Sequence, residues 1–164
     1  MSDNFNVSEP NAIDYLILCL QEPEINIKRI TVQTLSHIAK HSPDRTENIN
    51  SKDNLNFIMF YLKEKDNALR YKICTCLGNM AKNSHIVAQK IVSDLQSSII
   101  FECIKSSDSH LQRSAITLLN QIALRDTELA VTVNSKIDAR EIVNFFKKNQ
   151  GATRIFTLPL ISTI

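Results

Sequence analysis

The chain lacks several residue types, and each absence narrows the structures it can form. It has no Trp, only two Gly and only four Pro among 164 residues. Tight hairpin turns depend on Gly and Pro, so such a low content argues against a fold built from many short strands. Helices are therefore expected to dominate.

Long apolar runs and blocks of one charge sign are also missing. The most apolar stretch, around Ala12 to Leu20, is too short to span a bilayer, and the polar first eleven residues lack the basic region of a signal peptide. The net charge is +2, which favours neither a nucleic acid nor a membrane as partner. With 43% apolar residues, the chain is expected to form one domain with a buried core.

The usual signatures of catalysis and metal binding do not occur. The chain contains no Gly-rich phosphate loop, no nucleophile elbow and no H-E-x-x-H. His37 and His41 share a helix face and could in principle bind zinc, but no third ligand lies nearby in the sequence. The four cysteines follow no C-x-x-C spacing and lie in apolar runs, so they are predicted to be reduced core residues. We expect no enzymatic activity, no cofactor and no metal.

What the chain does have is an internal repeat. The segment Leu35–Ser42, L-S-H-I-A-K-H-S, returns as L-G-N-M-A-K-N-S at Leu77–Ser84 and as L-N-Q-I-A-L-R-D at Leu119–Asp126, each 42 residues after the last. A period of this length without slippage indicates an array of stacked helical units.

Each period divides into three amphipathic or apolar segments, which we interpret as a medium, a long and a short helix. Acidic residues directly before the long segments are predicted N-caps: Glu24, Asp66 and Asp108. The predicted medium helices are Asn11–Gln21, Asp53–Lys63, Leu95–Lys105 and Ile137–Lys147. The predicted long helices are Ile25–His41, Asn67–Asn83 and Ser109–Arg125, and the short ones are Asp44–Asn50, His85–Val92 and Thr127–Asn134.

Three helices in a period of about forty residues are typical of armadillo repeats, whereas two would indicate the HEAT type. The predicted fold is therefore all-α, an armadillo-type right-handed superhelical solenoid of about three to four 42-residue repeats over residues 11–164. Residues 1–10 are expected to be a disordered polar leader. The array should be incomplete at both ends, and the apolar run after Arg154 suggests a fragment of a longer solenoid or an end that docks elsewhere.

The long helices are expected to have two distinct faces. Steps of four, four and three define a core face, made of Ile27, Thr31, Leu35 and Ile38 and their equivalents in the next two copies. A polar stripe beside it should align into a ladder that hydrogen bonds an extended protein partner, unless it is merely a solvated helix face. The ladder positions are Arg29, Gln33, His37, Tyr71, Thr75, Asn79, Arg113, Thr117 and Gln121.

The run Gln21–Pro43 resembles a known family closely enough to name it. It is similar to the armadillo repeats of the sperm-associated antigen six family, proteins of the central apparatus of motile cilia and flagella. Resemblance extends more loosely over about Asn11–Arg154. The matching residues of the run are Gln21, Glu22, Pro23, Glu24, Ile25, Lys28, Arg29, Ile30, Leu35, Ser36, Ile38, Ala39, Lys40, His41, Ser42 and Pro43.

This resemblance implies a non-enzymatic scaffold in the cytoskeleton of the cilium or flagellum, at the axonemal central pair. Its partners would be central-pair proteins, with the microtubules themselves left as an open alternative, and no nucleic acid, membrane or small-molecule substrate is implied. The chain departs from the family where a Gly usually precedes the medium helix, as around Ser51–Asp53.

The alternative is a cytosolic armadillo adaptor that binds an extended peptide in another pathway. Nuclear-import receptors of this kind hold basic peptides on ladders of Trp and Asn. Here the Trp places carry Gln33, Thr75 and Thr117, and the Asn survives only at Asn79. Recognition of a basic import peptide is therefore not expected.

Overall fold

The computed structural model describes residues 12–50, 53–137 and 140. The predicted polar leader, the predicted fourth medium helix after Ile137 and the apolar run after Arg154 lie outside these residues. Every regular element in the described part of the chain is a helix.

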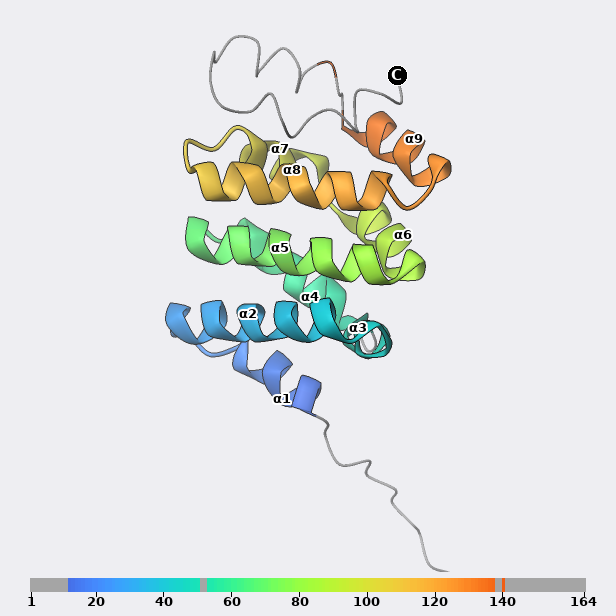
Figure 1. The fold of residues 1–164 in the computed structure, drawn as a ribbon. Coiled ribbons are helices and arrows are strands. Elements are labelled where there is room, and N and C mark those ends of the chain that lie inside the picture. Colours follow the sequence, from blue (N-terminus) through green and yellow to red (C-terminus); the bar gives the residue numbers. More distant parts are fainter. Residues whose placement is uncertain (1–11, 51–52, 138–139, 141–164) are drawn as a thin grey trace, which may run out of the picture.

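Three long helices form the front layer of the molecule (Figure 1). They are α2 (Ile25–His41), α5 (Asn67–Asn83) and α8 (Ser109–Ala123), and their first residues are 42 positions apart. The helix α5 lies between α2 and α8 and packs against both. The predicted starts are confirmed, although α8 ends two residues before the predicted Arg125, because the backbone N–H of Arg125 bonds to the carbonyl of Ile122, three residues back, at 3.1 Å and tightens the last turn.

The medium and short helices occupy two further positions in each unit. The medium helices are α1 (Ala12–Cys19), α4 (Asn54–Phe60) with the 3₁₀ turn η2 (Tyr61–Lys63), and α7 (Ser97–Ile104). Both α4 and α7 lie behind the long helices in Figure 1. The short helices α3 (Pro43–Asn50), α6 (His85–Asp94) and α9 (Thr127–Lys136) gather at the end where the long helices finish.

A carboxylate side chain caps the N-terminus of each of the three long helices, as predicted. Glu24 accepts the backbone N–H of Asn26 at 3.3 Å, and Asp66 accepts that of Leu69 at 2.6 Å. Asp108 accepts from both residues 110 and 111, at 2.9 and 3.1 Å. Each bond satisfies a backbone donor that the first helical turn leaves unpaired, a contribution of about 0.5–2 kcal/mol for a good cap.

The turn before α4 is formed without a glycine. Asp53 has φ 61° and ψ 12°, the left-handed conformation that glycine adopts most readily. Asp and Asn tolerate this region better than other residues with a Cβ atom. The equivalent turn before α7 is made differently, since Leu95 and Gln96 keep negative φ values of −67° and −75°.

The core runs continuously through the three units. The predicted core faces of α5 and α8 are fully buried, and so are Leu35 and Ala39 of α2. Three of the four cysteines are also buried and all four are free thiols, with Cys19 half-buried. No helix in the described residues combines the length and the apolar character needed to cross a membrane.

The prediction is wrong for Ile27, which is 38% exposed although its equivalents Leu69 and Leu111 are buried. The reason is its position in the array. Both α5 and α8 have a long helix packed on the side of the preceding unit, whereas the described residues provide none for α2. The helix α1 likewise exposes Tyr15 and Leu18 by more than half, although its sequence is apolar nearly all round.

Polar links between units lie where the helices end. The side-chain amide of Asn83 donates to the carbonyl of Ala39, and one period later Arg125 donates to the carbonyl of Lys82 at 2.7 Å. Helix C-termini leave their last carbonyls without partners inside the helix. In two successive units, the side chain at the same repeat position therefore donates a hydrogen bond to a terminal carbonyl of the preceding long helix.

Candidate functional site: the groove between α5 and α8

A groove of about 350 Å³ runs between α5 and α8, on the face where the long helices lie side by side. This volume falls within the range of about 300–1,000 Å³ typical of ligand sites. Residues 71 to 82 of α5 form one wall, and residues 110 to 121 of α8 form the other. The lining residues are Tyr71, Cys74, Thr75, Gly78, Asn79, Lys82, His110, Arg113, Ser114, Thr117 and Gln121.

Six of the nine predicted ladder positions line this groove. Tyr71, Thr75 and Asn79 come from α5, while Arg113, Thr117 and Gln121 face them from α8. The steps of four along each helix place each set of three on one side of its helix. The structure therefore brings the second and third predicted sets together into one concave surface.

The floor of the groove is made by small residues. Gly78 and Cys74 are buried, and Ser114 is half-buried. A Cβ atom built on Gly78 would stand 3.6 Å from the Cα atom of Leu118, which is ordinary contact distance. The two long helices therefore approach closely here, and the absence of a side chain at residue 78 keeps the floor low.

An aromatic pair lies at the end of the groove where α5 and α8 begin. The rings of Tyr71 and His110 have centroids 5.8 Å apart and are tilted by 39°. The ammonium group of Lys72 lies 5.3 Å from the centroid of the Tyr71 ring. These contacts hold Tyr71 beside the groove, where its ring can pack against an apolar part of a ligand.

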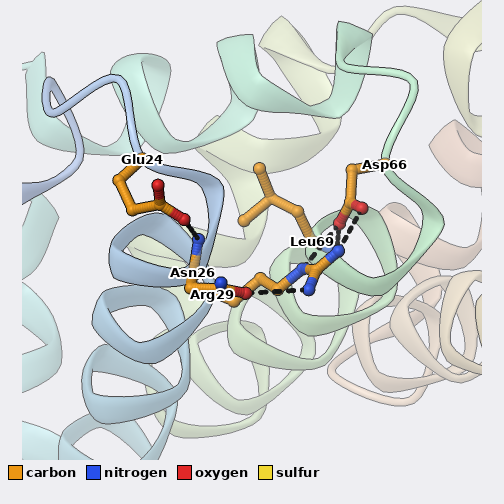
Figure 2. A network of polar contacts seen from close by, with 5 residues as sticks. All are labelled: Glu24, Asn26, Arg29, Asp66 and Leu69. Atoms are coloured by element: carbon orange, nitrogen blue, oxygen red, sulfur yellow. Dashed lines mark hydrogen bonds and ion pairs between the residues drawn. The ribbon is translucent and has the colours of Figure 1, made fainter.

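Arg29, the first of the remaining ladder positions, links α2 to the start of α5 (Figure 2). Its Nε donates to Asp66 Oδ1 at 3.0 Å and its Nη2 to Asp66 Oδ2 at 2.5 Å, while Nη1 donates to the side chain of Asn26 at 3.0 Å. Because Asp66 also caps α5, a single carboxylate joins two units. The hydrogen bonds from Arg29 lower the pKa of Asp66, and the backbone N–H of Leu69 lowers it further.

Gln33 and Asn79 form further links between α2 and α5. Gln33 accepts from the ammonium group of Lys72 at 2.7 Å, and the Asn79 amide donates to the hydroxyl of Ser36 at 2.9 Å. Asn79 therefore has a structural role as well as a place in the groove wall. The variant Asn79→Ala should therefore cost about 1 kcal/mol of stability besides any effect on binding.

His37 lies apart from the groove. It is exposed on α2, and its ring lies 6.5 Å from that of His41, edge to face. Within the described residues, no group of three or more His, Cys, Asp or Glu side chains could hold a metal ion.

Cys74, in the floor of the groove, pairs with a second thiol, Cys103, and the sequence analysis did not identify this pair. Arg70 donates to the sulfur of Cys103 at 3.3 Å and to Glu102 at 3.4 Å. A hydrogen bond with Cys74 lowers the pKa of Cys103, to which the charge of Arg70 adds, while the same bond and burial raise the pKa of Cys74. Burial alone raises the pKa of Cys76 to about 12.

Sequence reasoning also missed His110 and Lys82, which line the two ends of the groove. A signal for both was present in the helical period. His110 precedes Arg113 by three residues and Lys82 follows Asn79 by three, so each extends the predicted stripe by one more step on the same helix face.

Comparisons with known proteins support the fold alone. No protein-family model matches the chain, and no curated protein matches it. Three similar crystal structures are engineered proteins from the Northeast Structural Genomics Consortium, with 15–16% identity and TM-scores of 0.79, 0.82 and 0.72, each covering 94% of this chain. The chain spans 61%, 38% and 70% of the lengths of those proteins. The chain therefore shares an all-helical, repeat-like fold with these engineered proteins.

Proposed function

We propose that this chain is a non-enzymatic armadillo-type scaffold that binds an extended segment of a protein partner in the groove between α5 and α8. The observation that supports this most directly is the convergence of six predicted ladder residues on one groove. Amide, hydroxyl and guanidinium groups on opposite walls can hydrogen bond the backbone of an extended segment, whose own donors and acceptors remain unpaired.

We further propose that the partner belongs to the central apparatus of the ciliary or flagellar axoneme. This step rests on the similarity of the run Gln21–Pro43 to the sperm-associated antigen six family. Within that run, Glu24 caps α2 and Arg29 links α2 to α5, so part of the similarity falls on residues that hold two units together. A cytosolic adaptor in another pathway would use the same groove with a different partner.

Localisation in a flagellated cell tests both parts of this proposal. We expect the tagged chain to concentrate on the central pair. The variant Thr117→Trp should lose this localisation, because an indole at exposed Thr117 would fill the groove. The matched control is Gln89→Trp, which places the same side chain at an exposed position on α6, outside the groove.

The possible outcomes distinguish the axonemal scaffold from the cytosolic adaptor. A diffuse signal from the unmodified chain would reject the axonemal assignment and favour the cytosolic adaptor. Central-pair localisation that survives Thr117→Trp would instead show that partner binding does not use this groove. Circular dichroism of both Trp variants would establish that they are folded.

A further inference from the structure

We infer that Cys74 and Cys103 form a site of reversible oxidation, at which hydrogen peroxide converts the two thiols into a disulfide and Arg70 activates Cys103 as the attacking sulfur. The structure holds this pair in its reduced form, since all four cysteines are free thiols. The inference goes beyond the proposed function and does not depend on it, because it concerns the contact between α5 and α7 rather than a bound partner.

The two sulfurs meet between the second and third units of the array. Cys74 lies in the middle of α5 and Cys103 near the end of α7, and both side chains are fully buried. The Cys74 thiol donates a hydrogen bond to the sulfur of Cys103. A disulfide needs its two sulfurs about 2.05 Å apart. Two sulfurs that are already in hydrogen-bond contact start close to that separation.

Arg70 places a positive charge against Cys103. Its Nη2 donates to the Cys103 sulfur at 3.3 Å and to Glu102 at 3.4 Å. The hydrogen bond from Cys74 lowers the pKa of Cys103 and the charge of Arg70 lowers it further, whereas burial and the charge of Glu102 act in the opposite direction. The thiolate is the form of cysteine that attacks an oxidant. Cys103 is therefore the attacking sulfur, and Cys74 keeps its proton.

Arg70 also connects the buried pair with the surface. Its side chain is 12% exposed and contacts Glu102, whose side chain is 72% exposed, so Cys103 lies one side chain beneath the surface. Within the described part of the chain, the Nε of Arg70 is buried without a hydrogen-bond partner. This N–H belongs to the guanidinium group that contacts the sulfur, so it can donate to an oxygen atom placed on that sulfur.

The reaction proceeds in two steps. The Cys103 thiolate attacks one oxygen of hydrogen peroxide, the O–O bond breaks, and the leaving hydroxide takes a proton from solvent, which leaves a sulfenic acid on Cys103. The Cys74 sulfur then attacks the Cys103 sulfur, the S–O bond breaks, and the Cys74 proton leaves with the hydroxide as water. The pair loses two electrons, and the peroxide is reduced to two molecules of water.

Cys76 is an internal control in the same helix. It lies two residues from Cys74 and is equally buried, but burial raises its pKa to about 12. A thiol with such a pKa is almost entirely protonated at neutral pH, so it reacts slowly with an oxidant. Cys76 should therefore stay reduced under conditions that oxidise Cys74 and Cys103.

Thiol mapping of the full chain after exposure to hydrogen peroxide tests this inference. The reduced chain is treated at neutral pH, the peroxide is removed with catalase, and the chain is unfolded, alkylated with N-ethylmaleimide and digested with trypsin. Tandem mass spectrometry separates Cys74 from Cys76, which share the tryptic peptide 73–82. We expect a disulfide between Cys74 and Cys103 and an alkylated Cys76. Dithiothreitol should restore both thiols of the pair.

Substitution of Arg70 distinguishes activation of Cys103 from simple shielding. Arg70→Met should slow disulfide formation at neutral pH by about tenfold and move the rate profile to higher pH, because the thiolate loses its positive partner. Arg70→Lys should retain most of the rate because it keeps the charge. If Arg70 only shielded Cys103, its replacement would speed the reaction. The control Lys40→Met removes an exposed cation from α2 and should leave the rate unchanged.

Three results would overturn the inference. The first is that Cys74 and Cys103 form no disulfide with each other in the wild-type chain, a measurement that needs no variant. The second is that Cys76 is oxidised as fast as the pair, which would show that peroxide reacts with an opened chain. The third is that folded Arg70→Met, checked by circular dichroism, reacts as fast as wild type or faster. The localisation of Thr117→Trp is independent of all three results, so the proposed function is tested separately.

Discussion

At the scale of single residues, Gly78 shows how the second unit differs from its neighbours. Its equivalents in the repeat are two buried polar residues, Asn120 and Ser36, of which Ser36 accepts a hydrogen bond from Asn79. Gly78 has no side chain that could make a polar contact. It nevertheless lies within the long helix α5, where glycine is unfavourable because it loses the most backbone freedom on folding.

Replacing Gly78 by alanine is therefore expected to stabilise the protein by about 0.5–1 kcal/mol. The added methyl group would lie 3.6 Å from the Leu118 Cα atom, so the neighbouring helix does not need to move. Urea unfolding followed by circular dichroism measures the change. A loss of stability would mean that α5 and α8 pack more tightly here than the structure shows.

At the scale of helices, the contact between Arg29 and Asp66 combines a cap and a link between units. Because the pKa of Asp66 is lowered from 3.8, its stabilising effect is present at neutral pH and is lost as the pH falls through the folded-state value. Acid should therefore weaken the start of α5 and its attachment to α2 together.

The variant Asp66→Asn is expected to lower the melting temperature at neutral pH and to lose less of its remaining stability than wild type below about pH 4. Its control is Glu47→Gln, which removes the same charge from an exposed position on α3. Melting curves across this pH range make the comparison. If Asp66→Asn and wild type lose stability in parallel on acidification, the contact does not contribute in solution.

At the scale of the whole molecule, α5 is the element on which both neighbours depend. It packs against α2 on one side and α8 on the other, and its core residues are fully buried. In an array of this kind, stability is approximately the sum of unit terms and interfaces between neighbouring units. Damage to the middle unit should therefore weaken two interfaces at once.

Leu77→Ala is accordingly expected to destabilise the chain by about 2–5 kcal/mol, because it leaves a cavity at a fully buried position. The same substitution at Leu18, which is 54% exposed on α1, should change stability by less than about 0.5 kcal/mol. Urea unfolding compares the two variants directly. Similar losses for both would contradict the assignment of α5 as the central core element.

Much of the fold could be predicted because it depends on interactions within one repeat. Glu24, Asp66 and Asp108 were identifiable as caps from their place before each apolar pattern, and the long helices begin where those caps indicate. The burial of Ile27 was predicted wrongly because it depends on a neighbouring unit. A periodic pattern shows which face a helix would bury, but it does not show whether a neighbour is there to cover it.

For the candidate site as well, one part followed from the sequence and another part from the tertiary structure. By itself, the sequence determined the period of 42, the polar stripe and the nine ladder positions, since these follow from helical spacing alone. Only the tertiary structure decided that Arg29 and Gln33 bond to α5 while Tyr71, Thr75, Arg113, Thr117 and Gln121 line an open groove. The physical reason is that equivalent positions of the repeat carry different side chains. Whether two neighbouring long helices are joined by hydrogen bonds or leave a groove between them depends on which side chains meet across their interface.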